Sequence, residues 1–239
     1  MFKSTKGLLT LFFISLFISL FLILFLEEKE EDEFKILSEA SLLLEKLNSD
    51  ILMLRRHEKD FLSRKNSKYI LLFNKTHRTI QTHILILIDD LQHEKIDSRL
   101  LVSFRKSINK YADLFNQLAL KRETLGYHES EAKHLELKLI GKKLRTAVKD
   151  NKELNEPMHS LVHHENNFIL QRDMKYKDLF IFEKSSLSKK IKDTNIKTLL
   201  DTYANKFLTF VQEEIDIGLN ENLGLHGQMR NEIHESEEI

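Results

Sequence analysis

The chain has 239 residues, with 37 lysines and arginines against 37 aspartates and glutamates, no cysteine, six glycines and one proline. The lack of cysteine excludes a disulfide framework, a thiolate zinc site and an iron–sulfur cluster. The balanced charge argues against nucleic-acid binding, because a protein that neutralises phosphates needs a basic surplus. So few glycines and prolines cannot supply the turns of a sandwich, a barrel or a Rossmann sheet, and the composition therefore predicts long helices.

The first hydrophobic segment is long enough to cross a membrane. Residues 7–26 carry no charge, and about 20 apolar residues span a bilayer core of about 30 Å. Lys3 and Lys6 precede the segment and the acidic stretch 27–33 follows it, so the positive-inside rule places residues 1–6 in the cytoplasm and the bulk of the chain outside. A cleaved signal peptide would have a shorter apolar region and a small-residue cleavage site. We therefore expect an uncleaved transmembrane anchor.

Helical periodicity runs through the remaining sequence. No glycine or proline occurs from residue 33 to about residue 89, and apolar residues recur there at intervals of three and four, which predicts one long amphipathic helix. The apolar positions of this stripe are Ala40, Leu43, Leu47, Ile51, Leu54, Phe61, Leu72, Ile80, Ile84 and Leu87. Further helices are expected from Asp97 or Ser98 to Gly126, from 130 to 183 with an interruption near Pro157, from 185 to 217, and after Gly224. We predict an all-α, elongated bundle of long antiparallel helices.

The sequence also repeats itself. Residues 54–61 resemble residues 161–168 at an offset of 107, and residues 111–115 resemble residues 203–207 at an offset of 92. Several aligned residues at fixed offsets indicate a duplicated helical-hairpin unit. The chain ends as the last helix begins, so we expect the N-terminal part of a longer receptor, with its last helix truncated.

The first of the repeated segments contains a sequence that resembles a family signature. Residues 55–64 read RRHEKDFLSR and resemble the R-R-x-E-K-D-F-L-x-R signature of the helical bimodular sensor domain, which occurs in bacterial methyl-accepting chemotaxis receptors and sensor kinases. The resemblance covers roughly residues 34–239, with repeats at about 34–150 and 151–239. It implies two four-helix modules stacked end to end in the periplasm, anchored in the inner membrane, acting as a homodimer and binding a small organic acid between helices.

Basic residues near both ends of this region form the candidate ligand site. Arg55 and Lys59 lie four apart on one helix with Arg56 beside them, and His226 and Arg230 lie four apart on the last helix. If the two helices pack together, these residues would clamp a dicarboxylate, because the planar fork of arginine meets a carboxylate through two charge-assisted hydrogen bonds. Otherwise they are exposed charges or partners for acidic residues. Arg145, His163 and His164 are the candidates in the second module.

Two carboxylates fall within the apolar stripes. Glu58 lies between Leu54 and Phe61, and Glu165 occupies the matching position of the second repeat. A carboxylate on an inward face has to be paired, and we expect arginine or lysine partners on neighbouring helices. We favour a structural role for both residues over a ligand or proton site.

The sequence offers little chemistry. His163 and His164 are adjacent and point about 100° apart on a helix, and no H-E-x-x-H motif is present, so we expect no metal site. No catalytic triad, P-loop or G-x-G-x-x-G pattern predicts an enzyme or a cofactor. The favoured function is the periplasmic ligand-sensing part of a chemoreceptor. The alternative is a membrane-anchored helical bundle that binds a protein partner, or is structural, without a small-molecule ligand.

Overall fold

The computed structural model describes residues 5–128 and 131–237, and all regular structure in those residues is helical, which confirms the all-α prediction. Side chains are described at residues 15, 18–20, 35, 38–128 and 131–234. The helices are α1 (Thr5–Arg64), α2 (Lys68–His93), α3 (Arg99–Leu125), α4 (Ala132–Val148), α5 (Lys152–Gln171), α6 (Met174–Lys190), α7 (Thr194–Ile217) and α8 (Gly224–Glu237).

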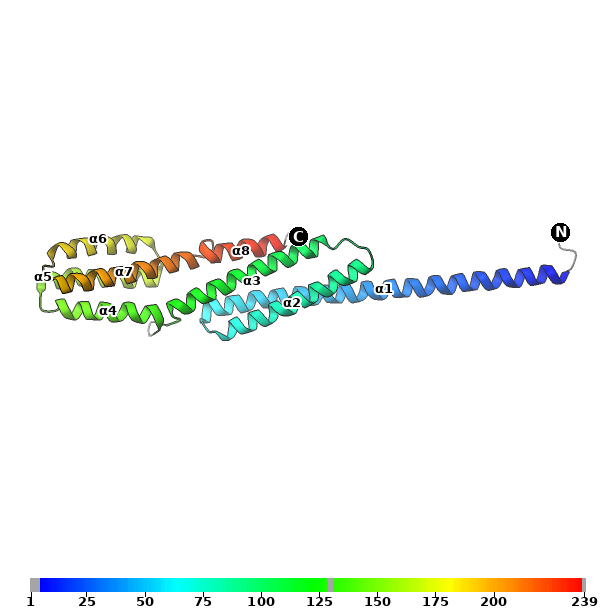
Figure 1. The fold of residues 1–239 in the computed structure, drawn as a ribbon, viewed down its shortest axis with the longest axis horizontal. Coiled ribbons are helices and arrows are strands. Elements are labelled where there is room, and N and C mark those ends of the chain that lie inside the picture. The colour runs from blue at the N-terminus through cyan, green and yellow to red at the C-terminus, as the bar shows by residue number, and fades with distance from the viewer. Residues whose placement is uncertain (1–4, 129–130, 238–239) are drawn as a thin grey trace.

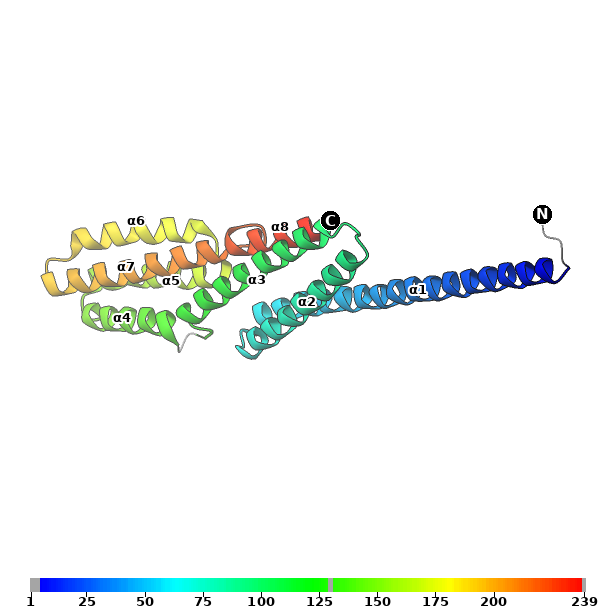
Figure 2. The ribbon, with the colours of Figure 1, turned by 45° about the vertical axis from the view of Figure 1, so that its right-hand side comes forward.

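The helices form two groups that follow one another along an elongated molecule (Figures 1 and 2). The first module contains α1, α2, α3 and α8, and the second module contains α4, α5, α6 and α7. The helix α8 follows α7 in the chain but packs along α3, so the first module is built from both ends of the chain. The N-terminal part of α1 projects beyond the other helices (Figure 1).

Each module contains the same aromatic cluster. In the first module Phe73 stacks on Phe115 at 3.8 Å between ring centroids, and Phe61 meets Phe115 edge-on at 5.5 Å. The matching rings of the second module are Phe168, Phe180 and Phe207, with centroid distances of 5.7 and 4.1 Å to Phe207. All six rings are fully buried. The repeat in sequence is therefore a repeat in packing.

The modules meet at a buried ion pair. Arg122 of α3 donates a hydrogen bond from Nη1 to Oε1 of Glu214 on α7 at 2.5 Å, and these side chains are 9% and 8% exposed. Nε of Arg172, which follows α5, lies 3.5 Å from the other oxygen of Glu214. Burial lowers the pKa of Arg172 while the charge of Glu214 opposes the shift. The pair joins helices of different modules and fixes their relative register.

The prediction of one continuous helix from residue 33 to residue 89 is wrong. The chain reverses after α1 at Lys65, whose φ is 48° and whose N–H donates to the carbonyl oxygen of Phe61 at 2.7 Å. The predicted stripe positions Ile80, Ile84 and Leu87 are buried on α2, so the stripe departs from the prediction only near the start of that helix. Tyr69 and Phe73 are buried there, whereas Leu72, which continued the predicted stripe, is exposed.

The interruption predicted near Pro157 is also wrong. The helix predicted over 130–183 breaks earlier, at Asn151, whose side chain caps α5 by accepting from the N–H of Glu153 at 3.0 Å. It breaks again between α5 and α6 at Arg172, whose φ is 53°. Pro157 is buried within the second turn of α5, where a single preceding turn leaves little helix for its ring to disturb. The helix predicted over 185–217 begins later, because α6 includes its first residues.

Across the side chains that are described, no helix is long and apolar enough to cross a membrane. The predicted span, residues 7–26, forms part of the backbone of α1. Apart from Ser15, Ile18, Ser19 and Leu20, its side chains lie outside the described ones.

Candidate ligand-binding clefts

A cleft of about 450 Å³ in the first module contains most of the site residues predicted for that module. Arg55 and Lys59 line it from α1, His226 and Arg230 line it from α8, and Tyr111 contributes from α3. The first and last helices therefore bring together four of the five basic residues predicted for this module. Arg55 and Lys59 are four apart on α1 and therefore lie on the same face of that helix.

The fifth residue, Arg56, lies outside the cleft. Its Nε lies 3.9 Å from Oδ2 of Asp60 on the same helix, and its side chain is 73% exposed. A residue next to Arg55 is rotated by about 100° around the helix. Arg56 therefore faces solvent, and it is the natural control for charge substitutions in the cleft.

Arg230 is already engaged at the rim of the cleft. Its Nη1 lies 2.7 Å from Oε1 of Glu221 and 3.1 Å from Oδ1 of Asn222, both in the turn before α8. Since this pair is partly exposed, it is held weakly. A ligand carboxylate that enters the cleft would compete with Glu221 for the guanidinium.

His226 brings a neutral ring to the same cleft. Burial lowers the pKa of its imidazole, and the nearby charges of Arg122 and Arg172 lower it further. Its buried Nε2 has no hydrogen-bond partner among the described residues. Buried ring nitrogens usually have one, so this nitrogen is an unsatisfied polar atom within the wall of the cleft.

The carboxylate of Glu58 forms part of the cleft wall. The buried hydroxyl of Tyr111 donates a short hydrogen bond to its Oε2. Burial raises the pKa of Glu58, while the tyrosine hydrogen bond and the charges of Arg55 and Lys59 oppose the shift. Burial beside this carboxylate also raises the pKa of Tyr111. The hydrogen-bond partner is thus a tyrosine, where the sequence led us to expect arginine or lysine.

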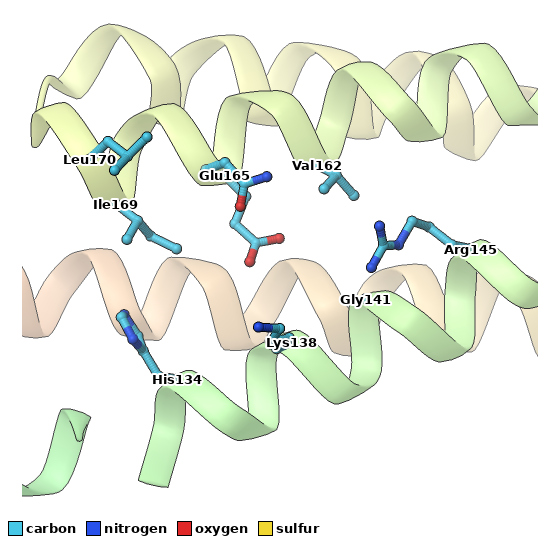
Figure 3. A pocket seen from close by; sticks show the side chains of 9 residues that line it. His134, Lys138, Gly141, Arg145, Val162, Glu165, Ile169 and Leu170 are labelled. Atoms are coloured by element: carbon cyan, nitrogen blue, oxygen red, sulfur yellow. The ribbon is translucent and has the colours of Figure 1, made fainter. Parts of the chain in front are cut away.

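The second module has a cleft of about 460 Å³ at the corresponding place, shown in Figure 3. Glu165 lines it from α5, and Lys138 and Arg145 line it from α4. The side chains of Arg145 and Glu165 point into the same space in Figure 3. Tyr203 of α7 donates a short hydrogen bond to Oε2 of Glu165, which is buried. The glutamate–tyrosine pair of the first module is therefore repeated.

The other second-module candidates lie elsewhere. His163 and His164 line a shallow groove along α5 that does not include Glu165 or Arg145. Nε2 of His163 is 2.9 Å from Nδ2 of Asn167 on the same helix. Among the described residues, no group of three or more histidines and carboxylates is arranged to hold a metal ion.

Sequence reasoning missed several residues of the two clefts. Tyr111 and Tyr203 were aligned by the repeat, but their hydrogen bonds to glutamate depend on how far one helix is displaced along another. Lys138 could have been found from Arg145, since the two are seven apart and share a helix face. Glu221 lies in a turn, where periodicity gives no signal.

Comparison of the chain with family models, with curated proteins and with solved structures gave no match in any of the three.

Proposed function

We propose that this chain is the ligand-sensing region of a membrane-anchored bacterial receptor of the helical bimodular type. In this proposal residues 7–26 anchor the chain in the inner membrane, the two modules lie in the periplasm, and two copies of the receptor form a dimer. Two modules in series, each built from one repeat pattern, support the proposal together with the signature in residues 55–64.

The ligand is a small organic acid of about two to four carbons that binds in the first-module cleft. The convergence of Arg55, Lys59 and Arg230 from two helices on one cleft carries this proposal. Carboxylates are recognised by such charge-assisted hydrogen bonds. A ligand held between α1 and α8 favours one relative position of these helices, and it shifts their equilibrium by its differential affinity for the two positions.

A thermal-unfolding screen of the full chain in detergent micelles tests this function. An acid at a hundredfold its Kd adds about 2.7 kcal/mol to the free energy of unfolding and raises Tm by several degrees. Arg230→Ala is expected to abolish the increase and Arg56→Ala to retain it. No increase with any acid, on a cooperatively unfolding sample, would refute small-acid sensing.

A protein partner is the second candidate function. Three large apolar side chains of α6 are exposed, Leu179, Ile181 and Phe182, and Phe182 is 72% exposed. Exposed apolar groups of this kind are typical of protein interaction sites. If the acid screen is negative, cross-linking from position 182 in a periplasmic extract distinguishes a protein sensor from a structural bundle.

A further inference from the structure

The glutamate in the first-module cleft is an unusual feature for a site that attracts anions. Glu58 lines the cleft together with Arg55, Lys59 and Arg230. A carboxylate ligand bound by those cations would lie beside a second carboxylate in a partly buried space. Like charges so placed disfavour one another, and one of the pair gains a proton.

The surroundings of Glu58 favour its protonation. Its carboxylate is half-buried, and the Tyr111 hydroxyl engages only Oε2. The other oxygen, Oε1, is the one left to carry a proton. The pKa of Glu58 is raised by burial and held down by Tyr111, Arg55 and Lys59. A ligand that draws Arg55 and Lys59 to its own carboxylate weakens that opposition.

We infer that the first-module cleft binds an organic acid together with one proton, which Glu58 takes up. The proton comes from solvent and forms an O–H bond at Oε1, so Glu58 becomes a neutral carboxylic acid. Tyr111 continues to donate to Oε2. The new O–H then donates to the ligand carboxylate, and a repulsive neighbour becomes a hydrogen-bond donor. This inference rests on the proposed function, because it needs a carboxylate ligand in this cleft.

Titratable groups on every element around the cleft influence the protonation of Glu58. Arg55 and Lys59 come from α1 and Tyr111 from α3. The remaining titratable groups of the lining are Glu221 in the turn after α7, and His226, Arg230 and His234 on α8. The His226 imidazole is kept neutral by burial and by cations. Of the two acidic groups among the described residues of the lining, Glu58 is half-buried, whereas Glu221 is exposed and paired with Arg230.

Calorimetric titration of the full chain with succinate in two buffers of different ionisation enthalpy measures the proton directly. At about pH 7 both carboxyl groups of succinate are ionised, so any proton taken up belongs to the protein. We expect the observed enthalpy to differ between the buffers, with a slope of up to one proton. The affinity should fall as pH rises, by at most about tenfold per pH unit, the limit for uptake of one proton.

Two variants assign the proton to a residue. Glu58→Gln is expected to abolish proton uptake, to bind succinate more tightly than the native chain at high pH, and to make the affinity independent of pH. Glu136→Gln, which changes an exposed carboxylate outside both clefts, should behave like the native chain. Far-UV circular dichroism establishes that both variants fold.

Three results would overturn the inference. Succinate binding without proton uptake would contradict the inference but not the proposed function. Weaker binding by Glu58→Gln would mean that Glu58 accepts a hydrogen bond from the ligand in its charged form. Failure of every acid in the thermal screen to bind removes both the proposed function and this inference.

Discussion

The buried ion pair at the module junction allows a strict test of the duplicated architecture. Positions 122 and 214 are 92 apart, the same offset that relates Tyr111 to Tyr203, so Arg122 and Glu214 occupy equivalent places on α3 and α7. Exchanging the two residues should therefore form the same ion pair, with the glutamate on α3 and the arginine on α7. Lys65 and Arg172 are equivalent at the offset of 107, so a glutamate at position 122 would find Lys65 where Glu214 now finds Arg172.

The expected loss in the free energy of unfolding follows from the burial of the Arg122–Glu214 pair. Removing one partner of a buried ion pair costs about 3–5 kcal/mol, because the other charge is left without compensation. Both side chains here are less than a tenth exposed. Arg172 is 32% exposed and 3.5 Å from Glu214, so solvent screening makes its share small. We therefore expect Arg122→Glu and Glu214→Arg each to cost at least about 3 kcal/mol, or about 6–12 °C in Tm for a chain of this size.

Urea unfolding followed by far-UV circular dichroism gives the four free energies of this double-mutant cycle. The double exchange should recover most of the loss, with a coupling energy well above 1 kcal/mol. Lys206→Glu, which disrupts the exposed pair with Glu136, is the control and should cost less than about 1 kcal/mol. A double exchange as unstable as the sum of its single variants would refute the equivalence of the two positions.

Three further predictions concern the fold. Gly218→Ala should destabilise the chain by about 1–3 kcal/mol in urea unfolding, because its φ of 120° is strained for alanine and a Cβ would lie 2.1 Å from the carbonyl oxygen of Leu223. Phe73→Ala should cost about 3–5 kcal/mol in the same assay, since the ring is fully buried and stacked. Tyr111 and Tyr203 have a raised pKa from burial beside glutamate. Their contribution to stability is present below the unfolded pKa of about 10 and is lost as pH rises further, so the absorbance titration at 295 nm should show them ionising only on unfolding.

The helix ends marked by glycine were predictable. Gly126 and Gly218 follow α3 and α7 as expected, and α8 begins at Gly224. All three have positive φ, which is a conformation that glycine adopts without steric cost. Local backbone chemistry fixes these boundaries, so the sequence alone was sufficient.

The reversal at Lys65 was not predictable in the same way. Its φ of 48° falls on a lysine, and no glycine or proline marks the turn. The apolar spacing before and after it also fits a continuous helix. The local signal is Asn66, whose side-chain oxygen accepts from the N–H of Lys68 at 3.0 Å where α2 begins, and a periodicity argument does not detect it. For the site, the sequence identified the face of α1 that lines the cleft. It did not identify how far one helix is displaced along another, and for that reason it did not predict the tyrosine partners of the glutamates.

The two clefts share one hydrogen bond and differ in their cations. The glutamate and its tyrosine occur at matching positions in both modules. The cations of α1 do not, because Val162 and Asn166 occupy the places of Arg55 and Lys59, and the second cleft takes Lys138 from α4 instead. The shared tyrosine hydrogen bond to Oε2 is explained by the equivalent packing of the helices, and it leaves Oε1 of Glu58 for the proposed proton. It follows that removing a tyrosine hydroxyl should lower the stability of its module, whereas removing a cleft cation should change binding alone.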